Sequence, residues 1–190
     1  MKRPCVFFDR DGTLNEDVGY LDRLERLVLY PDCIDAVRLL KRAGYVVVVV
    51  TNQAGVAHGL YGEDTVREIH RHMAARFEAG RAAIDGFYYC PHLAEAPVAA
   101  YRRDCDCRKP RPGLVRQAER ELDIDVARSF VVGDRWRDIE MGIAVGARTV
   151  LVRTGYGRTE EAHPPPGVAP GVVVDNVTQA VVWILQQGRT

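Results

Sequence analysis

Two carboxylates that lie two residues apart, Asp9 and Asp11, follow a short apolar run near the start of the chain. The run, residues 5–8, is followed by Asp-Arg-Asp-Gly, a pattern typical of a buried strand that ends in a turn. Two acids held this close repel each other unless a cation neutralises them, and a divalent metal is the usual cation. The pattern therefore predicts an active site at the carboxyl end of a parallel strand, where open α/β sheets bind their ligands.

Four ligand-type residues form two close pairs further along the chain, Cys90 with His92 and Cys105 with Cys107. Three thiolates and one imidazole make a closed tetrahedral set of the kind that binds zinc structurally, with no position open for water. The segment between the pairs is polar and shows no strong periodicity, so we expect a metal to hold it in place. Ordinary half-buried thiols are the alternative, but two such tight pairs favour a zinc loop over residues 90–107.

Three further groups of polar side chains follow predicted strands or the second cysteine pair. They offer a hydroxyl with two amides, two cations, and a carboxylate beside a cation, all of which suit a phosphate or its metal. Each group alone has an ordinary explanation, as a turn, a solvated loop or a helix cap. Their order and their common place at strand ends favour one shared site. The groups are Thr51, Asn52 and Gln53; Arg108 and Lys109; and Asp134 and Arg135.

Alternating strand and helix patterns connect these groups. Short apolar runs predict strands at residues 6–8, 45–50, 86–89, 129–132, 149–152 and 172–174. Apolar residues at helical spacing predict helices at residues 32–43, 64–79, 112–122, 137–145 and 177–187. Repeated βα units with buried strands predict an α/β fold with a doubly wound parallel sheet. We expect a single domain over residues 1–190.

Composition and charge argue against several classes of protein. The chain has 26 basic and 26 acidic residues, a balance that disfavours nucleic-acid binding through a broad basic face. No apolar stretch approaches the roughly 20 residues needed to span a bilayer, and the start of the chain does not resemble a signal peptide. We therefore expect a cytoplasmic protein that binds no membrane. Five cysteines without an export signal disfavour a disulfide framework. No apolar stripe beyond the core faces is evident, so we expect a monomer.

The ordered motifs resemble those of the haloacid dehalogenase (HAD) superfamily, which run Asp-x-Asp-Gly-Thr, Thr or Ser, Lys and Gly-Asp. The resemblance covers nearly the whole chain and implies a HAD-like Rossmannoid phosphatase. It implies a nucleophile at Asp9, a general acid and base at Asp11, and phosphoryl-stabilising roles for Thr51 and Lys109. It also implies a catalytic Mg²⁺ held by the Asp9 carboxylate, the main-chain carbonyl of Asp11 and Asp134.

The zinc loop, directly before Arg-Lys-Pro, resembles one small group of the superfamily that has no large cap domain. The group includes heptose bisphosphate phosphatases and histidinol-phosphate phosphatases, and segments 8–15, 51–57 and 88–92 look most like the former. The resemblance implies removal of the 7-phosphate of D-glycero-D-manno-heptose 1,7-bisphosphate through an aspartyl-phosphate, for nucleotide-activated heptose synthesis. Histidinol phosphate or another small sugar phosphate is the alternative. The residues implied to contact the substrate are Asp17, Gly19, Tyr20, Asn52, Gln53, Arg108 and Arg135.

The charges beside the motifs bear on the choice of substrate. A bisphosphate carries a second phosphate away from the cleaved bond, and Arg108 and Arg135 can bind it through paired hydrogen bonds. Histidinol phosphate presents an amine and an imidazole, which Glu16 and Asp17 could bind. The heptose enzymes often carry Lys where this chain has Arg135, so the preferred anomer stays open. The expected partner is a small phosphorylated sugar and not a nucleic acid.

A zinc-stabilised binding module without turnover is the alternative from another functional class. The complete set of motif residues argues against it, because a chain that has lost catalysis is expected to have lost at least one of them. The other histidines, at positions 58, 70, 72 and 163, are assigned no catalytic role.

Overall fold

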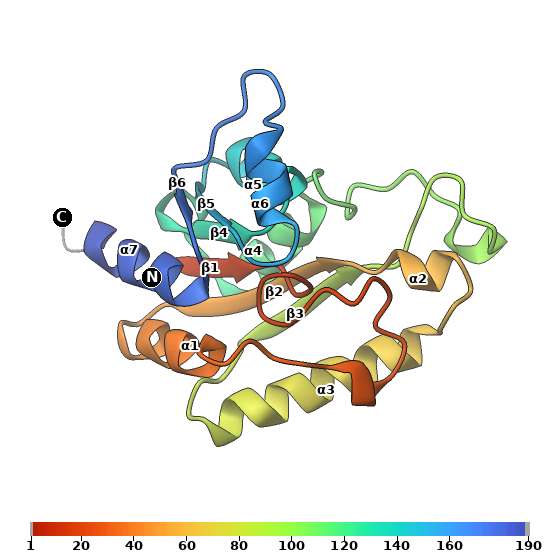
Figure 1. Ribbon diagram of the computed structural model, residues 1–190, viewed down its shortest axis with the longest axis horizontal. Coiled ribbons are helices and arrows are strands. Elements are labelled where there is room, and N and C mark those ends of the chain that lie inside the picture. Colours follow the sequence, from red (N-terminus) through yellow and green to blue (C-terminus); the bar gives the residue numbers. More distant parts are fainter. Residues whose placement is uncertain (1, 189–190) are drawn as a thin grey trace.

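The computed structural model describes residues 2–188 and contains a six-stranded sheet with helices on both faces (Figure 1). The strands lie in the order β3-β2-β1-β4-β5-β6, and every neighbouring pair is parallel. The prediction of a doubly wound parallel sheet is therefore confirmed. The strands are β1 (Cys5–Phe8), β2 (Val46–Asn52), β3 (Gly86–Cys90), β4 (Phe130–Gly133), β5 (Arg148–Val152) and β6 (Val172–Val174).

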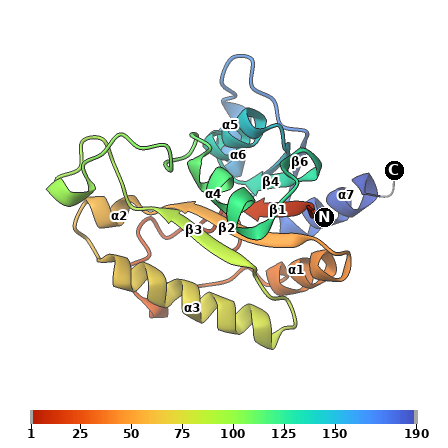
Figure 2. The same ribbon diagram turned by 180° about the vertical axis from the view of Figure 1, so that it is seen from behind.

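Helices cover the two faces of the sheet in separate layers (Figures 1 and 2). One face packs against α1 (Cys33–Arg42), α3 (Glu63–Ala79) and α7 (Val177–Gln187). The other face packs against α4 (Gly113–Leu122) and α5 (Trp136–Val145). Each βα unit thus places its helix on one side or the other, which is the arrangement expected of a doubly wound fold.

The central strand β2 shows why its sequence is apolar throughout. Val47 and Val49 belong to the core beneath α1, α3 and α7, whereas Val46, Val48 and Val50 belong to the core beneath α4 and α5. Successive side chains of a strand point to opposite faces, so a strand buried on both faces needs apolar residues at every position. The run of valines is thereby explained by the two helical layers.

The carboxyl ends of β1 and β4 meet at the point where the strand order changes direction. The chain that leaves β1 leads to α1 on one face of the sheet, whereas the chain that leaves β4 leads to α5 on the other face. The loops after these two strands therefore diverge and leave a crevice. Asp9 follows β1 directly and its backbone N–H still bonds to the carbonyl of Val132, 2.9 Å away. Asp134 follows β4 directly. The fold therefore brings together two carboxylates that are far apart in the sequence.

The segments that could have formed a cap domain are loops. Residues 9–32 contain only the short 3-10 turn η1 (Leu24–Arg26), and residues 91–112 contain only η2 (Ala99–Tyr101). As expected, residues 2–188 contain no large cap domain. The Pro-rich segment 163–170 is also a loop, and it projects from the body of the molecule at the top of Figure 1.

Several elements differ from their predicted bounds at the site. The strand predicted to stop at Val50 continues to Asn52, because Thr51 and Asn52 pair with Tyr89 and Cys90 of β3. A local pattern of polar residues suggested a turn there, and the pairing that overrides it is contributed by a distant strand. The short helices α2 (Ala54–Ala57) and α6 (Gly157–Ala162), and the turn η3 (Val126–Arg128), were not predicted, since they are too short to show helical periodicity.

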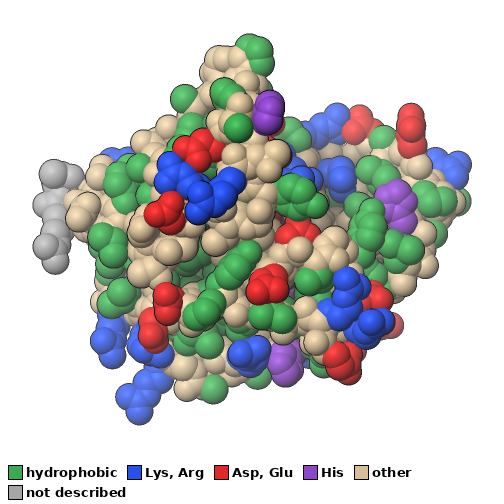
Figure 3. Space-filling model, viewed as in Figure 1, with side chains coloured by type: hydrophobic (Ala, Val, Ile, Leu, Met, Phe, Trp, Pro, Cys, Tyr) green, Lys and Arg blue, Asp and Glu red, His purple; other side chains and the backbone are tan. Residues whose placement is uncertain are grey.

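Surface features agree with the balanced composition. On the face shown in Figure 3, Lys and Arg side chains lie interspersed with Asp and Glu. Within residues 2–188, no helix combines the length and the apolar character needed to cross a membrane.

Candidate active site and metal centres

Three buried carboxylates, Asp9, Asp134 and Asp138, converge at the carboxyl end of the sheet. One oxygen from each lies within 4.8 Å of the others. Asp9 and Asp134 come from the ends of β1 and β4, as the sequence predicts. Asp138 was not predicted; it lies in the first turn of α5, which begins two residues after Asp134. The spacing Asp-x-x-x-Asp across a strand end and the following helix start was the available signal.

Lys109 neutralises part of this cluster. Its Nζ lies 2.8 Å from Asp9 Oδ1 and 2.6 Å from Asp138 Oδ1, and donates to the carbonyl of Val50 at 2.9 Å. Burial alone would lower the pKa of Lys109, but the two carboxylates raise it above its ordinary value. The side chain is therefore a buried cation. The Asn52 amide fixes the loop, because it both donates to the Lys109 carbonyl (3.1 Å) and accepts from the Lys109 N–H (3.0 Å).

Asp134 has no cation of its own within the described residues. Its Oδ2 accepts from the backbone N–H of Tyr156 at 2.8 Å, while its Oδ1 is buried and has no hydrogen-bond partner there. Burial, together with the negative charges of Asp9 and Asp138, raises the pKa of Asp134 to about 8. Gly12, at φ +82°, lets the backbone pass directly over this carboxylate. Carboxylate oxygens without a cation are what Mg²⁺ binds, so these residues fit that metal.

The charges around Asp134 predict how the stability of the metal-free protein depends on pH. The folded protein binds the Asp134 proton far more tightly than the unfolded chain, whose ordinary pKa is 3.8. The stability from this group is therefore complete below about pH 4 and is lost as pH rises through about 8. We expect the metal-free protein to melt at a lower temperature at pH 8 than at pH 5, and Mg²⁺ to raise the melting temperature more at pH 8. Two results would contradict the raised pKa of Asp134. One is that Mg²⁺ raises the melting temperature equally at both pH values; the other is that the melting temperature of Asp134→Asn depends on pH as steeply as that of the wild type.

Asp11 lies on the wall of the same crevice in a network of donors. Arg10 forms two hydrogen bonds to its carboxylate, of 3.1 and 2.9 Å, and the amides of Asn15 and Gln53 donate at 2.9 and 3.0 Å. Burial opposes ionisation, but Arg10 and these amides hold the pKa of Asp11 below its ordinary value. Gln53 also donates to Thr51 Oγ1 at 2.9 Å. The network thus joins the predicted acid to the predicted phosphoryl stabiliser.

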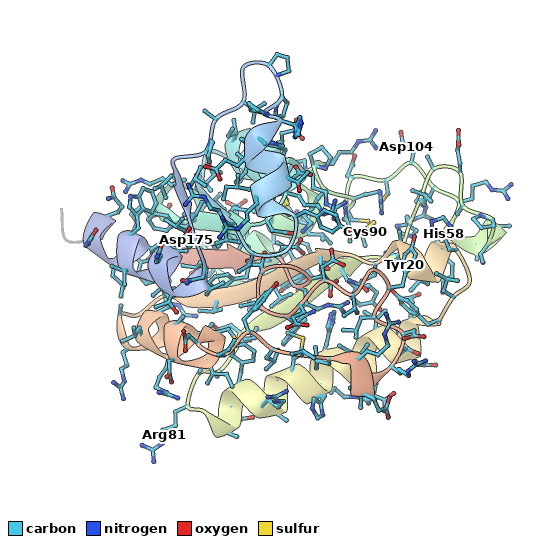
Figure 4. All side chains as sticks on the ribbon, viewed as in Figure 1. Tyr20, His58, Arg81, Cys90, Asp104 and Asp175 are labelled. Atoms are coloured by element: carbon cyan, nitrogen blue, oxygen red, sulfur yellow. The ribbon has the colours of Figure 1, made fainter. Side chains whose placement is uncertain are left out.

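A cavity of about 350 Å³ opens above these groups. Every residue that the sequence predicts as a substrate contact lines it, so the structure brings the whole predicted set together. Tyr20 and His58 are labelled in Figure 4, and their rings meet edge to face with centroids 5.9 Å apart. The lining also includes Ala54, Tyr61, Arg137 and Tyr156, which were not predicted, and Asp11, the predicted general acid and base.

Three guanidinium groups, from Arg108, Arg135 and Arg137, make the cavity wall positive. Arg135 lies over the ring of Tyr156, 3.5 Å from its centroid, and 3.4 Å from the Asp17 carboxylate. Arg108 donates to the backbone carbonyl of His92 (3.1 Å) and forms no ion pair within residues 2–188. Arg137 makes no hydrogen bond or ion pair with any residue in the described part of the chain, and its Nε is buried. A half-buried guanidinium whose N–H groups lack hydrogen-bond partners is costly, and an anionic ligand would reduce that cost.

The zinc-ligand prediction can be tested against distances. The three sulfur atoms of Cys90, Cys105 and Cys107 lie 3.1–3.5 Å apart, and His92 Nδ1 lies 3.3 Å from Cys107 Sγ and 3.8 Å from Cys90 Sγ. Four donors at such spacing enclose a small tetrahedral space, and none of the cysteines is in a disulfide. The set fits Zn²⁺. Because Cys107 directly precedes Arg108 and Lys109, a metal here would also fix the two cations of the active site.

Comparisons with known proteins extend this description. A sequence model of the family described as polynucleotide kinase 3 phosphatase matches residues 5–141, and a HAD-hydrolase-like model matches residues 106–180. The D-glycero-beta-D-manno-heptose-1,7-bisphosphate 7-phosphatase of Haemophilus influenzae is 43% identical over 160 residues, which cover 84% of this chain and 86% of that protein. The enzyme of the same name from Vibrio cholerae is 37% identical over 98% of both chains.

Solved structures give the same result. The D,D-heptose 1,7-bisphosphate phosphatase of B. bronchiseptica, complexed with magnesium and phosphate, superposes with a TM-score of 0.85 at 31% identity and covers 97% of this chain and 99% of its own. The enzyme of the same name from Burkholderia thailandensis superposes with a TM-score of 0.65 at 30% identity, covering 96% and 99%. The chain therefore belongs to the HAD-like hydrolases and, within them, to the D-glycero-beta-D-manno-heptose-1,7-bisphosphate 7-phosphatase family.

Proposed function

We propose that this phosphatase removes the 7-phosphate of D-glycero-β-D-manno-heptose 1,7-bisphosphate and releases heptose 1-phosphate for the synthesis of nucleotide-activated heptose. The family supports this substrate, since the named relatives act on it. The carrying observation is the wall of the cavity, where the guanidinium groups of Arg108, Arg135 and Arg137 line the same space as Asp11. A substrate with one phosphate at the reacting end and a second anion elsewhere matches this distribution of charge.

Histidinol phosphate fits the cavity less well. Its amine and imidazole need carboxylates, and the Asp17 carboxylate is already engaged by Arg135 and by the backbone N–H of Gly19 at 2.8 Å. Glu16 is exposed and does not line the cavity. Among the described residues, the loop after the first motif therefore offers no unengaged carboxylate to the cavity, whereas the cavity wall includes the guanidinium of Arg137, which has no hydrogen-bond partner.

In the mechanism, the Asp9 carboxylate attacks phosphorus in line and becomes an aspartyl-phosphate, while the bond to the sugar oxygen breaks. Lys109 and the Thr51 hydroxyl hold the phosphoryl oxygens, which carry most of the charge in the transition state. Mg²⁺ would be held, directly or through water molecules bound to the metal, by Asp9, the Asp11 carbonyl, Asp134 and Asp138. When bound, the metal offsets the negative charge of the phosphate and so makes attack by a carboxylate feasible.

Asp11 handles the protons in both steps. Its carboxyl group gives a proton to the departing sugar oxygen, and the resulting carboxylate takes a proton from the water that attacks the aspartyl-phosphate. That second attack releases inorganic phosphate and restores Asp9. The hydrogen bonds from Arg10 and Gln53 favour the ionised form of Asp11, which is the form that accepts the proton from water.

Phosphate release with Mg²⁺ across a substrate panel tests the proposal. The panel contains both anomers of heptose 1,7-bisphosphate, histidinol phosphate, fructose 1,6-bisphosphate and a 3′-phosphorylated oligonucleotide. We expect the highest kcat/KM with the β anomer. A preference for histidinol phosphate would overturn the substrate assignment, and a preference for the oligonucleotide would place the chain with the polynucleotide phosphatases instead.

Arg137 provides a residue-level test of the anion-binding wall. Charged hydrogen bonds contribute about 1.5–3 kcal/mol, so Arg137→Gln is expected to raise KM for heptose 1,7-bisphosphate about 10–100-fold with a smaller effect on kcat. The same variant should leave KM for heptose 7-phosphate nearly unchanged, because that substrate lacks the second phosphate. Arg120→Gln, at an exposed position on α4, is the matched control. Equal KM increases for both substrates would show that Arg137 does not bind the second phosphate.

A further inference from the structure

Arg10 is an unusual residue because its guanidinium is only 1% exposed yet lies beside the reacting groups. Its Nε and Nη2 donate to the two oxygens of Asp11, and Nη2 also donates to Gln53 Oε1 at 3.0 Å. The remaining nitrogen, Nη1, lies 3.2 Å from Nε2 of His70. Arginine can only donate, so His70 must accept through Nε2 and carry its proton on Nδ1. The imidazole therefore has to be neutral.

Three features of His70 agree with this role as an acceptor. The residue is 6% exposed, on the face of α3 that packs on the sheet. Burial and the nearby charge of Arg10 lower the pKa of His70 to about 3, so its ring is neutral throughout the working range of an enzyme. Its ring stacks on Phe87 with centroids 4.9 Å apart and meets the edge of Tyr89 at 5.7 Å. Strand β3 thus clamps the imidazole in one orientation.

We propose that His70 is a positioning residue for the general acid and base: it holds the Arg10 guanidinium, which in turn aligns the carboxyl group of Asp11 with the sugar oxygen. The role rests on the proposed phosphatase function and extends it to a residue outside the cavity. Without His70, Nη1 would lose its buried acceptor, and the guanidinium would have to tilt away from Asp11 to find another one. A catalytic group misplaced by about 1 Å can lose about 100-fold in rate.

The chemistry of the leaving group separates this role from a purely structural one. An aliphatic alkoxide, such as the sugar oxygen, needs a proton as it leaves, whereas p-nitrophenolate is stable without one. The kcat/KM value covers the steps up to departure of the leaving group. Loss of alignment at Asp11 should therefore lower kcat/KM for the sugar phosphate and spare kcat/KM for p-nitrophenyl phosphate.

The test compares His70→Phe with the wild type on heptose 1,7-bisphosphate and on p-nitrophenyl phosphate. Phenylalanine keeps a ring to stack on Phe87 but offers no acceptor. We expect kcat/KM for the sugar bisphosphate to fall at least about tenfold, because general acid catalysis typically contributes 10²–10⁴-fold, while the value for p-nitrophenyl phosphate changes less than about threefold. His70→Gln, whose amide oxygen can accept from Arg10, should recover most of the loss.

The matched control is His72→Phe, two residues along α3 and exposed, which should change neither value. If His70→Phe does not fold, His70→Leu replaces it in the same comparison. Equal losses on both substrates, or no loss on the sugar bisphosphate, would overturn the positioning role. A wild type inactive on both substrates would instead overturn the proposed phosphatase function, so the two failures are distinguishable.

Discussion

Asp9→Asn is expected to reduce phosphate release by at least about 10⁴-fold while the protein remains folded, since removing a covalent nucleophile leaves only binding and electrostatic effects. An amide has nearly the same shape as the carboxylate and keeps the oxygen that accepts from the backbone N–H of Arg10 at 2.7 Å. It also removes one negative charge from a buried cluster in which Asp134 lacks a cation. We therefore expect the melting temperature of the metal-free variant to equal or exceed that of the wild type.

Covalent labelling and turnover, measured together, distinguish a nucleophilic role of Asp9 from a purely electrostatic one. Acid quenching during turnover of a ³²P-labelled substrate should leave label on the wild-type protein and none on Asp9→Asn. Asp32→Asn, at an exposed position before α1, is the control and should keep both label and turnover. Normal turnover by Asp9→Asn, or covalent label retained by a folded variant, would refute the mechanism.

How much the sequence predicts depends on how local each signal is. The strand run before Asp9 and the two cysteine pairs are short-range patterns, so both the motif and the zinc set were predictable from neighbouring residues. Asp17 and Arg135, predicted substrate contacts that are far apart in the sequence, line one cavity. The rule that ligands bind at the carboxyl ends of parallel strands made it possible to expect them there. The sequence therefore predicted which edge of the sheet carries the site and the order of the polar groups along that edge.

Of the residues that sequence analysis missed, Asp138 and Arg137 depend on where α5 begins, and His70 depends on a contact between distant segments. Asp138 needs the first turn of α5 to point back at β4, and Arg137 lines the cavity only because that helix begins at Trp136. The sequence analysis assigned His70 no catalytic role; its proposed role depends on its contact with Arg10, 60 residues earlier. Periodicity places such a side chain on a buried face, but it does not identify the group it will meet there.

Cys107→Ser is expected to have the second large effect, on stability and activity together. We propose that Cys90, His92, Cys105 and Cys107 hold a structural Zn²⁺, and structural zinc contributes about 10–16 kcal/mol to the folding of small zinc domains. Here the metal would fix only one loop beside a larger core. We therefore expect Cys107→Ser to lower the free energy of unfolding by only part of that amount, about 3–5 kcal/mol. At roughly 2–4 °C per kcal/mol for a protein of this size, the melting temperature should fall by about 10 °C.

The effect on activity follows from the connection between the two centres. Cys107 precedes Arg108 and Lys109, and the Lys109 ammonium must stay between Asp9 and Asp138 to offset their charge. A loosened loop should therefore lower kcat as well as the zinc content measured by atomic absorption, whereas Asp106→Asn, at the exposed residue between two ligands, should lower neither. A Cys107→Ser protein that has lost its zinc but melts and turns over like the wild type would show that the metal does not stabilise this loop.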